Sequence, residues 1–168
     1  RQAYKRVKGL IVISNGIKND LLKLGIPEEK ICVARDAVDL EQFQIGVSKE
    51  QARNRLTMPL AQKIVVYTGH LYDWKGAGVL AQAAKLLSQD IHIYLVGGTD
   101  EDVKRFKETY QSPNLHIVGW RKHEEIPYWL RAAGVLVLPN SAKSRIGAKD
   151  TSPLKLFEYM MAGRPIVA

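Results

Sequence analysis

The stretch KIVVYTGHLYDWKGAGVLAQAAKLLSQDIHIYLVGG, residues 63–98, decides the fold class. It holds two continuous apolar runs, at 63–69 and 91–98, and each run ends in glycine. Between them, residues 76–89 carry apolar side chains at helical spacing. Apolar strands that alternate with helices are typical of a parallel sheet covered on both faces. The stretch therefore predicts a strand–helix–strand unit of such a sheet.

The same alternation extends in both directions. Downstream, we expect strands at 115–119, 134–139 and 165–168 and helices at 100–110, 124–133 and 152–163; upstream, strands at 9–14 and 30–34 enclose one helix, and another is expected at 48–56. Right-handed crossovers between such strands give a doubly wound, Rossmann-like α/β sheet.

The composition limits the classes of protein to consider. The 168 residues carry a formal charge of +8 and include a single cysteine, Cys32. No intrachain disulfide can form, which favours a reducing compartment. No apolar run approaches the roughly 20 residues of a membrane-spanning helix. The basic balance favours anionic partners, but its charges are scattered, so a solvated basic surface and a functional patch both stay open.

Ligands of doubly wound sheets bind beyond the carboxyl ends of the strands. This rule selects the loops that follow the predicted strands, namely GHLYDWKG (69–76), GGTDED (97–102), GWRKHE (119–124) and PNSAKSRIGAKDTS (139–152).

The last of these loops leads into a helix start that suits a phosphate. Ser152 and Pro153 are a favourable N-cap and first residue, and Lys155 adds a charge in the first turn. The free N–H groups from Leu154 onward can bind an anion. Two acids flank this start, Asp150 and Glu158. Glu158 is placed to bind a ligand hydroxyl, although a loop acid and a helix-surface acid are the alternative interpretation.

The other loops offer weaker candidates. Lys75 could meet a diphosphate and His70 could donate a hydrogen bond to it, with a solvated lysine and a capping histidine as the alternative. Asp100 and Asp102 resemble a metal pair but are better explained as acids at a helix N-terminus. The segment Trp120–Lys122 could lie along a base or could form an exposed turn.

Several chemistries lack support in the sequence. There is no zinc-type Cys/His spacing, no P-loop and no Gly-x-Ser-x-Gly elbow. His92 and His116 fall within strand patterns and fit core or edge positions better than metal ligands. Nucleic-acid binding rests on charge alone, so we expect no nucleic-acid partner.

Three segments together resemble a known family. VISNGIKNDLLKLGIPEEKICVARDAVDLEQF is similar to a hinge region, VVYTGHLYDWKG to a Gly-Arg-Leu-x-x-x-Lys-Gly phosphate loop, and PNSAKSRIGAKDTSPLKLFEYMMAGRPIVA to a Glu-x7-Glu segment. In this order they resemble the retaining, nucleotide-sugar-dependent glycosyltransferases of family 4, which have the two-domain GT-B fold. The resemblance implies the C-terminal, donor-binding half of such an enzyme, truncated at its C-terminal end.

The resemblance assigns a role to each candidate. Lys75 would contact the donor diphosphate beside Gly69 and His70, and Glu158 would hold the nucleotide ribose. Asp150, Lys75 and Glu158 would be the catalytic residues. The complete donor-binding set is Gly69, His70, Lys75, Trp120, Arg121, Lys122, Ser152, Pro153, Leu154 and Glu158. Trp120–Lys122 would lie near the base, and Ser152–Leu154 near the distal phosphate and sugar.

The sequence departs from the family pattern at three places. His70 stands where arginine is usual, Asp150 stands where the first glutamate is expected, and residues 151–153 replace a glycine-rich turn. The resemblance implies cations and helix N–H groups that stabilise the departing diphosphate, without a carboxylate nucleophile. Asp150 would orient sugar hydroxyls. No metal and no cofactor are expected, and the donor would be a UDP-, GDP- or ADP-sugar.

The resemblance also predicts the domain organisation. Residues 1–38 would be the tail of an N-terminal domain with its hinge, and residues 39–168 the nucleotide-sugar-binding domain. The acceptor, a glycan or lipid-linked molecule, would bind through the absent N-terminal domain. We expect a cytoplasmic protein, with peripheral contact at the cytoplasmic face of a membrane as an open alternative, and a fragment inactive by itself. A non-catalytic nucleotide- or sugar-phosphate-binding module is the alternative function.

Overall fold

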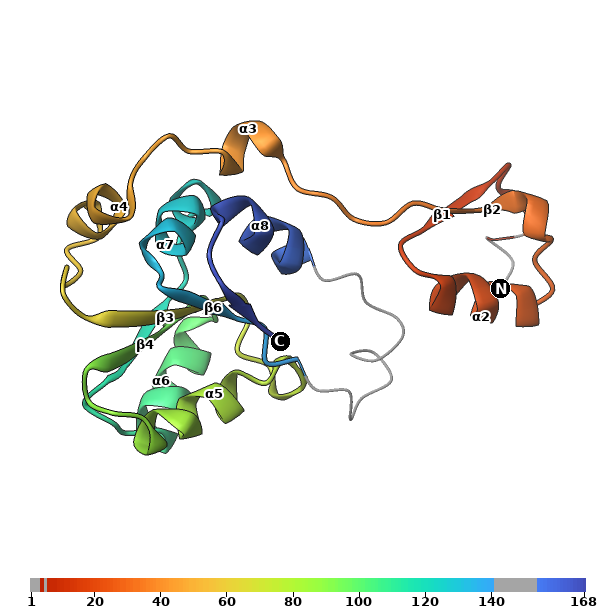
Figure 1. The fold of residues 1–168 in the computed structure, drawn as a ribbon. Coiled ribbons are helices and arrows are strands. Elements are labelled where there is room, and N and C mark those ends of the chain that lie inside the picture. The colour runs from red at the N-terminus through yellow and green to blue at the C-terminus, as the bar shows by residue number, and fades with distance from the viewer. Residues whose placement is uncertain (1–3, 5, 141–153) are drawn as a thin grey trace. The chain divides into compact units, whose positions relative to one another are not determined.

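A computed structural model describes residues 4, 6–140 and 154–168 of the chain (Figure 1). The described residues fall into two compact units. One holds the residues up to Ala37, and the other comprises Val38–Asn140 and Lys155–Ala168. That the first unit is the tail of an N-terminal domain stays a prediction.

The first unit is a small βαβ arrangement. Strands β1 (Leu10–Val12) and β2 (Ile31–Val33) pair in parallel, with helix α2 (Asn15–Lys23) and the 3-10 turn η1 (Glu28–Lys30) between them. Ser14 caps α2 by accepting a hydrogen bond from the Ile17 N–H at 3.2 Å. Its core consists of Val12, Leu21, Ile26 and Ile31.

The second unit is built on a parallel sheet with the strand order β5-β4-β3-β6-β7. The strands are β3 (Lys63–Thr68), β4 (Ile91–Val96), β5 (Leu115–Gly119), β6 (Val135–Val137) and β7 (Ile166–Val167). β3 is the central strand, because it pairs with β4 from Lys63↔Ile91 onward and with β6 from Val65↔Val135.

Helices cover both faces of this sheet (Figure 1). They are α3 (Leu40–Phe43), α4 (Lys49–Arg55), α5 (Ala77–Ala83), α6 (Asp100–Thr109), α7 (Ile126–Ala132) and α8 (Leu154–Ala162), with 3-10 turns η2 (Asp73–Lys75), η3 (Ala84–Leu86) and η4 (His123–Glu125). Ile64 and Val66 of β3 pack in the cluster that includes α4, α7 and α8, whereas Tyr67 packs in the cluster that includes α5 and α6. The predicted α/β class is confirmed.

Details of the elements differ from the sequence expectation. The helix predicted at 76–89 is α-helical only to Ala83 and continues as the 3-10 turn η3. The last predicted strand is reduced to Ile166–Val167, and the short helix α3 was not predicted. At α6, Thr99 and Asp102 form a capping box, which agrees with the interpretation of the acids there as helix-start residues.

A buried arginine connects α4 to the end of α7 and to the segment before β3. Arg53 on α4 is only 3% exposed and donates hydrogen bonds to the carbonyls of Ala132 at 2.9 Å, Leu60 at 2.6 Å and Gln62 at 3.0 Å. Because these bonds satisfy carbonyls at the end of α7 and before β3, the guanidinium fixes α4 to the amino end of the sheet.

Candidate functional site

The carboxyl end of β3 carries a group of polar side chains that come from different elements. Tyr67 is fully buried, and its hydroxyl donates to the His70 carbonyl at 2.7 Å. The ammonium of Lys155, on α8, donates to the same hydroxyl at 3.0 Å. One turn further on, the Tyr159 hydroxyl accepts from the Thr68 N–H at 2.9 Å. These contacts fix α8 against the end of the central strand.

Two lysines at this end of the sheet lie in poorly solvated surroundings. Burial, with added repulsion from Lys75 and against an opposing effect of Glu158, lowers the pKa of Lys155 to about 7. Burial also lowers the pKa of Lys75, the last residue of η2. The Lys75 ammonium lies 4.2 Å from the centre of the Trp74 ring. Both side chains would gain from an anionic ligand, because a nearby opposite charge favours the protonated form.

Two glycines keep this corner open to close approach. Gly69 has a φ of +129°, and a Cβ there would lie 2.5 Å from both Cε and Nζ of Lys155. Gly76 has a φ of +75°, and a Cβ there would collide with the Pro139 carbonyl oxygen. Both positions favour glycine because of their positive φ, and at Gly76 the backbone of Pro139 also leaves no room for a side chain.

Glu158 lies beside a histidine at the edge of this corner. Its carboxylate oxygen lies 3.6 Å from Nε2 of His123, and its side chain is 17% exposed. The other ring nitrogen of His123 is 2.7 Å from the Gln42 side-chain amide nitrogen, and the ring meets Phe43 edge-on at 5.4 Å between centroids. Since Gln42, His123 and Glu158 come from three elements, the carboxylate is oriented by tertiary structure and not by its helix alone.

The remaining candidates lie on exposed loops. Trp120 is 66% exposed, and the Arg121 guanidinium donates to its carbonyl at 2.8 Å. Lys122 is exposed and precedes η4, whose first residue is His123. The exposed His70 ring stacks on Tyr72 with 4.9 Å between centroids. Of these loops, the one after β5 leads into η4, where His123 contacts Glu158 of α8.

Part of the predicted site lies outside the described residues. Asp150, Ser152 and Pro153 belong to this part. Leu154 is the first residue of α8 and is 51% exposed. The roles assigned to these four residues stay predictions.

The structure adds residues that the sequence did not single out as ligands. Lys155 was noted only as a first-turn charge, although its position three residues before Glu158 puts the two on one helix face. Gln42 and His123 gave no signal, because their contact joins positions far apart in the chain.

The described residues contain neither a group of three or more His, Cys, Asp or Glu side chains able to hold a metal ion nor a helix of membrane-spanning length and polarity. His92 and His116 are hydrogen-bonded to each other, with 2.8 Å between ring nitrogens.

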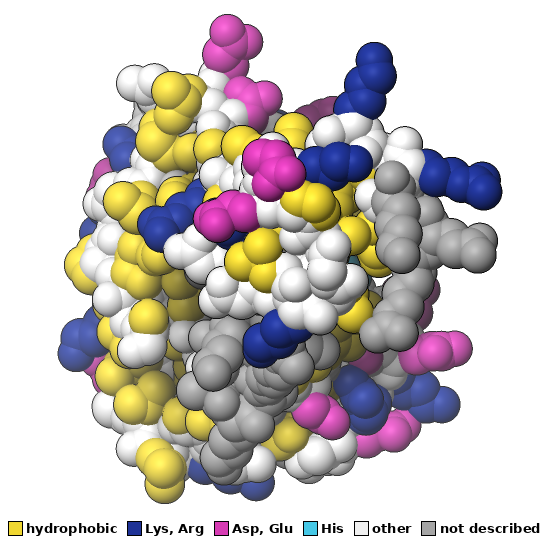
Figure 2. Space-filling view, turned by 90° about the vertical axis from the view of Figure 1, so that its right-hand side faces the viewer, with side chains coloured by type: hydrophobic (Ala, Val, Ile, Leu, Met, Phe, Trp, Pro, Cys, Tyr) yellow, Lys and Arg dark blue, Asp and Glu magenta, His cyan; other side chains and the backbone are white. Residues whose placement is uncertain are grey.

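On the face that Figure 2 shows, Lys and Arg side chains stand among acidic and hydrophobic ones and do not gather into one basic patch.

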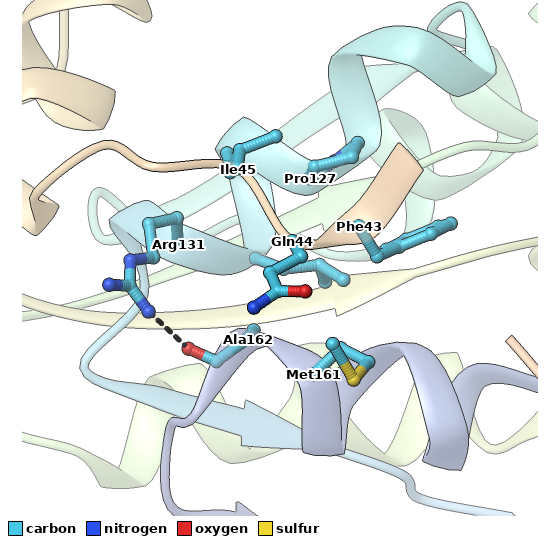
Figure 3. A pocket seen from close by; sticks show the side chains of 8 residues that line it. Phe43, Gln44, Ile45, Pro127, Arg131, Met161 and Ala162 are labelled. Atoms are coloured by element: carbon cyan, nitrogen blue, oxygen red, sulfur yellow. Dashed lines mark hydrogen bonds between the residues drawn. The ribbon is translucent and has the colours of Figure 1, made fainter. Parts of the chain in front are cut away.

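A separate cavity of about 350 Å³ lies where the segment after α3 meets α7 and α8 (Figure 3). Arg131 lines it and donates to the carbonyls of Ala162 at 3.0 Å and Val47 at 2.8 Å. These bonds give the arginine a structural role. The cavity shares no residue with the predicted donor site; its lining is Phe43, Gln44, Ile45, Pro127, Leu130, Arg131, Met161 and Ala162.

Comparison with known proteins points to one family of enzymes. The chain is 28% identical over 165 residues to the amylovoran biosynthesis glycosyltransferase AmsK of Erwinia amylovora, covering 95% of this chain and 38% of that protein. It is 27% identical over 174 residues to the putative colanic acid biosynthesis glycosyltransferase WcaL of Escherichia coli K12, covering 100% of this chain and 41% of that protein. The chain thus spans less than half the length of these curated relatives.

Solved structures share the fold. Anabaena HepE, in complex with UDP and glucose, superposes with a TM-score of 0.78 at 20% identity, over 99% of this chain and 45% of that one. WaaG, a glycosyltransferase involved in lipopolysaccharide biosynthesis, gives a TM-score of 0.72 at 17% identity, over 94% of this chain and 43% of that one.

The sequence profile of the glycosyl transferases group 1 matches residues 62–168, which begin just before β3 and include the loop 69–76, Lys155 and Glu158. By this match, the chain belongs to the group 1 glycosyl transferases.

Proposed function

We propose that this chain is the donor-binding domain of a retaining glycosyltransferase, which transfers a sugar from a nucleotide diphosphate to a glycan, a lipid-linked molecule or another acceptor. The observation that carries the proposal is the convergence at the end of β3. There, the glycine-rich loop with Lys75 meets α8, which brings Lys155 and Glu158. Two desolvated lysines beside an open backbone are suited to a diphosphate, whose charge would compensate theirs.

The donor would lie across the carboxyl edge of the sheet. Lys75 would bind the diphosphate beside Gly69 and His70, and the start of α8 would face the distal phosphate and the sugar through Ser152–Leu154. Glu158 would accept hydrogen bonds from the ribose hydroxyls, for which the His123 contact preorients it. The base would lie along Trp120, Arg121 and Lys122. The UDP complex of Anabaena HepE, which shares this fold, supports a nucleotide as part of the donor.

The chemistry would be electrostatic. As the bond between the sugar and the diphosphate breaks, negative charge develops on the leaving phosphate, and the nearby ammonium groups and helix N–H groups stabilise it. Asp150 would orient sugar hydroxyls, and the acceptor would attack from the face that the diphosphate leaves. No carboxylate nucleophile and no metal would take part, because the lysines supply the positive charge.

The rest of the enzyme would bind the acceptor. An N-terminal domain, of which residues 1–38 would be the tail and hinge, would bind it, and the chain of residues 1–168 would transfer no sugar by itself. We place the enzyme in the cytoplasm, at the cytoplasmic face of a membrane where its acceptor is lipid-linked. The AmsK and WcaL relatives, named for the biosynthesis of amylovoran and colanic acid, support a polysaccharide product.

Calorimetric titration of the complete protein that contains this chain, with UDP, GDP and ADP, tests the donor site. We expect one diphosphate to be preferred and its affinity to fall at least about tenfold in Lys75→Ala and in Glu158→Ala. Glu108→Ala, an exposed change on α6, is the matched control. The absence of binding to all three diphosphates would contradict the proposal.

The non-catalytic module is a second candidate, favoured by His70, which stands where the Gly-Arg-Leu-x-x-x-Lys-Gly pattern that the loop resembles has arginine. Such a module would bind the sugar donor as the enzyme does but would not cleave it. Release of free nucleotide from the sugar donor in the presence of an acceptor extract supports the enzyme, whereas donor binding without release supports the module.

A further inference from the structure

Lys155 is a cation without an ion-pair partner among the described residues. Its ammonium contacts a hydroxyl, that of Tyr67 at 3.0 Å, and lies 4.2 Å from the centre of the same ring. The tyrosine cannot neutralise it, because burial raises the pKa of Tyr67 far above its ordinary value. The nearest acid on the same helix face, Glu158, lies 3.6 Å from His123, and no described carboxylate lies within ion-pair distance of Lys155.

The end of this side chain occupies space that a glycine leaves free. The end of the Lys155 stem lies across Gly69, where any Cβ would fall 2.5 Å from it. Gly69 begins the loop that leads to Lys75, and Lys75 is close enough to disfavour the charge on Lys155. The two ammonium groups therefore approach the same end of β3 from two elements, although like charges repel.

The protonated form of Lys155 is disfavoured in the free protein and would be favoured by a bound anion. Burial and the neighbouring charge lower the pKa of Lys155 to about 7, so much of the population is neutral at slightly alkaline pH. Tyr67, Lys75 and Glu158 are the described titratable groups that face it. A diphosphate at this site would add negative charge beside both lysines and would restore the protonated form.

We propose that Lys155 is a phosphate-contacting residue of the donor site, which exchanges the Tyr67 hydroxyl for a phosphate oxygen and takes up a proton from solvent when a nucleotide sugar binds. The inference rests on the proposed function and extends it with a second cation on α8. It separates Lys155 from a purely structural lysine, because a side chain that only packs on Tyr67 has no reason to change its protonation when the donor arrives.

Proton uptake provides a direct test on the complete protein. The probe is the sugar nucleotide that binds among UDP-glucose, GDP-glucose and ADP-glucose. Its phosphates are both esterified, so it lacks the terminal phosphate group that titrates near pH 6. Calorimetry at pH 8 in buffers of different ionisation enthalpy should give uptake approaching about one proton per bound nucleotide, and clearly less at pH 6, where Lys155 is already charged.

Two variants assign the proton to this side chain. Lys155→Met should lose the uptake and bind the probe about tenfold or more weakly at pH 6, where the wild-type ammonium is present. Lys155→Arg keeps the charge and cannot release it, so the uptake should vanish while the affinity at pH 8 stays within about threefold of the wild type. Lys104→Met, on the exposed side of α6, should change neither quantity.

The outcomes separate the inference from the function on which it rests. Wild-type binding without proton uptake at pH 8, or unchanged uptake in a folded Lys155→Met or Lys155→Arg variant, overturns the inference and leaves the donor site in place. If the wild type binds none of the three sugar nucleotides and none of the three diphosphates at either pH, the proposed function fails and the inference fails with it.

Discussion

The ammonium nitrogen of Lys155 lies 3.0 Å from the hydroxyl oxygen of Tyr67, and these residues are 88 positions apart in the chain. Tyr67 belongs to the central strand β3 and Lys155 to the helix α8 that packs on it. A charged group has thus been brought into a poorly solvated corner with a neutral partner. Such an arrangement costs stability in the free protein, and a bound anion would offset that cost.

This cost should be visible in a variant without the charge. The pKa of Lys155 is lowered to about 7 in the folded protein, whereas an unfolded lysine titrates near about 10.4. Between these pH values the unfolded chain binds more protons, so the contribution of Lys155 to the free energy of unfolding rises with pH. At pH 7 this contribution is unfavourable, because the folded state holds the charged lysine less well than the unfolded chain does. Lys155→Met removes the charge and should stabilise the protein at pH 7 by on the order of 1–3 kcal/mol.

Urea unfolding followed by tryptophan fluorescence measures this difference at pH 7 and pH 9.5. The advantage of Lys155→Met over the wild type should shrink at the higher pH, because the folded lysine is then neutral and removing its proton costs less as the pH approaches the unfolded value near about 10.4. A variant that is less stable than the wild type at pH 7 would refute the buried-charge argument.

A methyl group at position 69 should damage both stability and donor binding. Gly69→Ala places a Cβ 2.5 Å from the Lys155 side chain at a backbone φ of +129°. We expect a loss of about 1–3 kcal/mol in unfolding free energy and a fall in nucleotide affinity of about tenfold. Melting temperature and calorimetric titration measure the two effects.

Gly46→Ala is the matched control for this change, because a Cβ at Gly46 would meet nothing within 4 Å. It should leave both quantities close to the wild type. Equal effects at the two positions would show that the close approach of Lys155 to Gly69 is unimportant.

The His123 ring should influence donor affinity without touching the donor. Its Nε2 lies 3.6 Å from the Glu158 carboxylate, and its Nδ1 is 2.7 Å from the Gln42 amide. Without the ring, Glu158 can adopt further rotamers that do not face a ribose. We expect His123→Ala to weaken nucleoside diphosphate binding about three- to tenfold, which corresponds to roughly 1 kcal/mol.

Glu124→Ala, a change at the exposed neighbour on η4, tests whether general damage to this turn explains the effect. A positioning role also predicts non-additivity: in Glu158→Ala, the further loss of His123 should have little effect. Full additivity of the two losses would contradict the role assigned to His123.

The paired histidines on β4 and β5 predict sensitivity to acid. Burial, together with the neighbouring His92, lowers the pKa of His116, whose ring also stacks on Tyr94 at 4.3 Å between centroids. An unfolded histidine titrates near about 6.5, so the unfolded chain takes up its proton first as the pH falls. The folded state therefore loses stability as the pH drops through about 6.5 and toward the lowered value.

Apparent melting temperatures at pH 7.5 and 5.5 test this expectation. His116→Leu should lose less stability on acidification than the wild type, because the leucine has no proton to bind. His70→Leu removes an exposed ring and should keep the wild-type response. An undiminished acid loss in His116→Leu would exclude the pair as its source.

The sequence predicts the layers of this fold better than its contacts. The runs at 63–68 and 91–96 form the two longest strands of the described part of the chain, because continuous apolar residues need cover on both faces. Local signals also placed the start of α6, where Thr99 and Asp102 satisfy each other's backbone N–H groups. The end of α5 could not be placed this way, since alanine-rich sequence fits both the α-helix and the 3-10 turn that follows it.

At the candidate site, too, sequence patterns indicate individual residues but not the contacts between them. Lys75 and Glu158 stand out from sequence patterning because each sits beside an identifiable strand end or helix start. The contact of Lys155 with Tyr67 and that of His123 with Glu158 join distant segments, and only the packed sheet and helices bring them together. Sequence patterning identifies side chains at an edge of the sheet, whereas their orientation is decided by tertiary packing.

The pairing of β3 with β6 has a consequence for how this domain forms. Val65 aligns with Val135, so the central strand cannot complete its second ladder until β4, β5 and the helices between them have been made. Closing so long a stretch of chain is entropically expensive, and such non-local pairing slows folding. Because α8 follows β6 in the chain, the corner with Lys155 is assembled late on the ribosome, and an early-terminated product would expose one open edge of β3 as a template for aggregation.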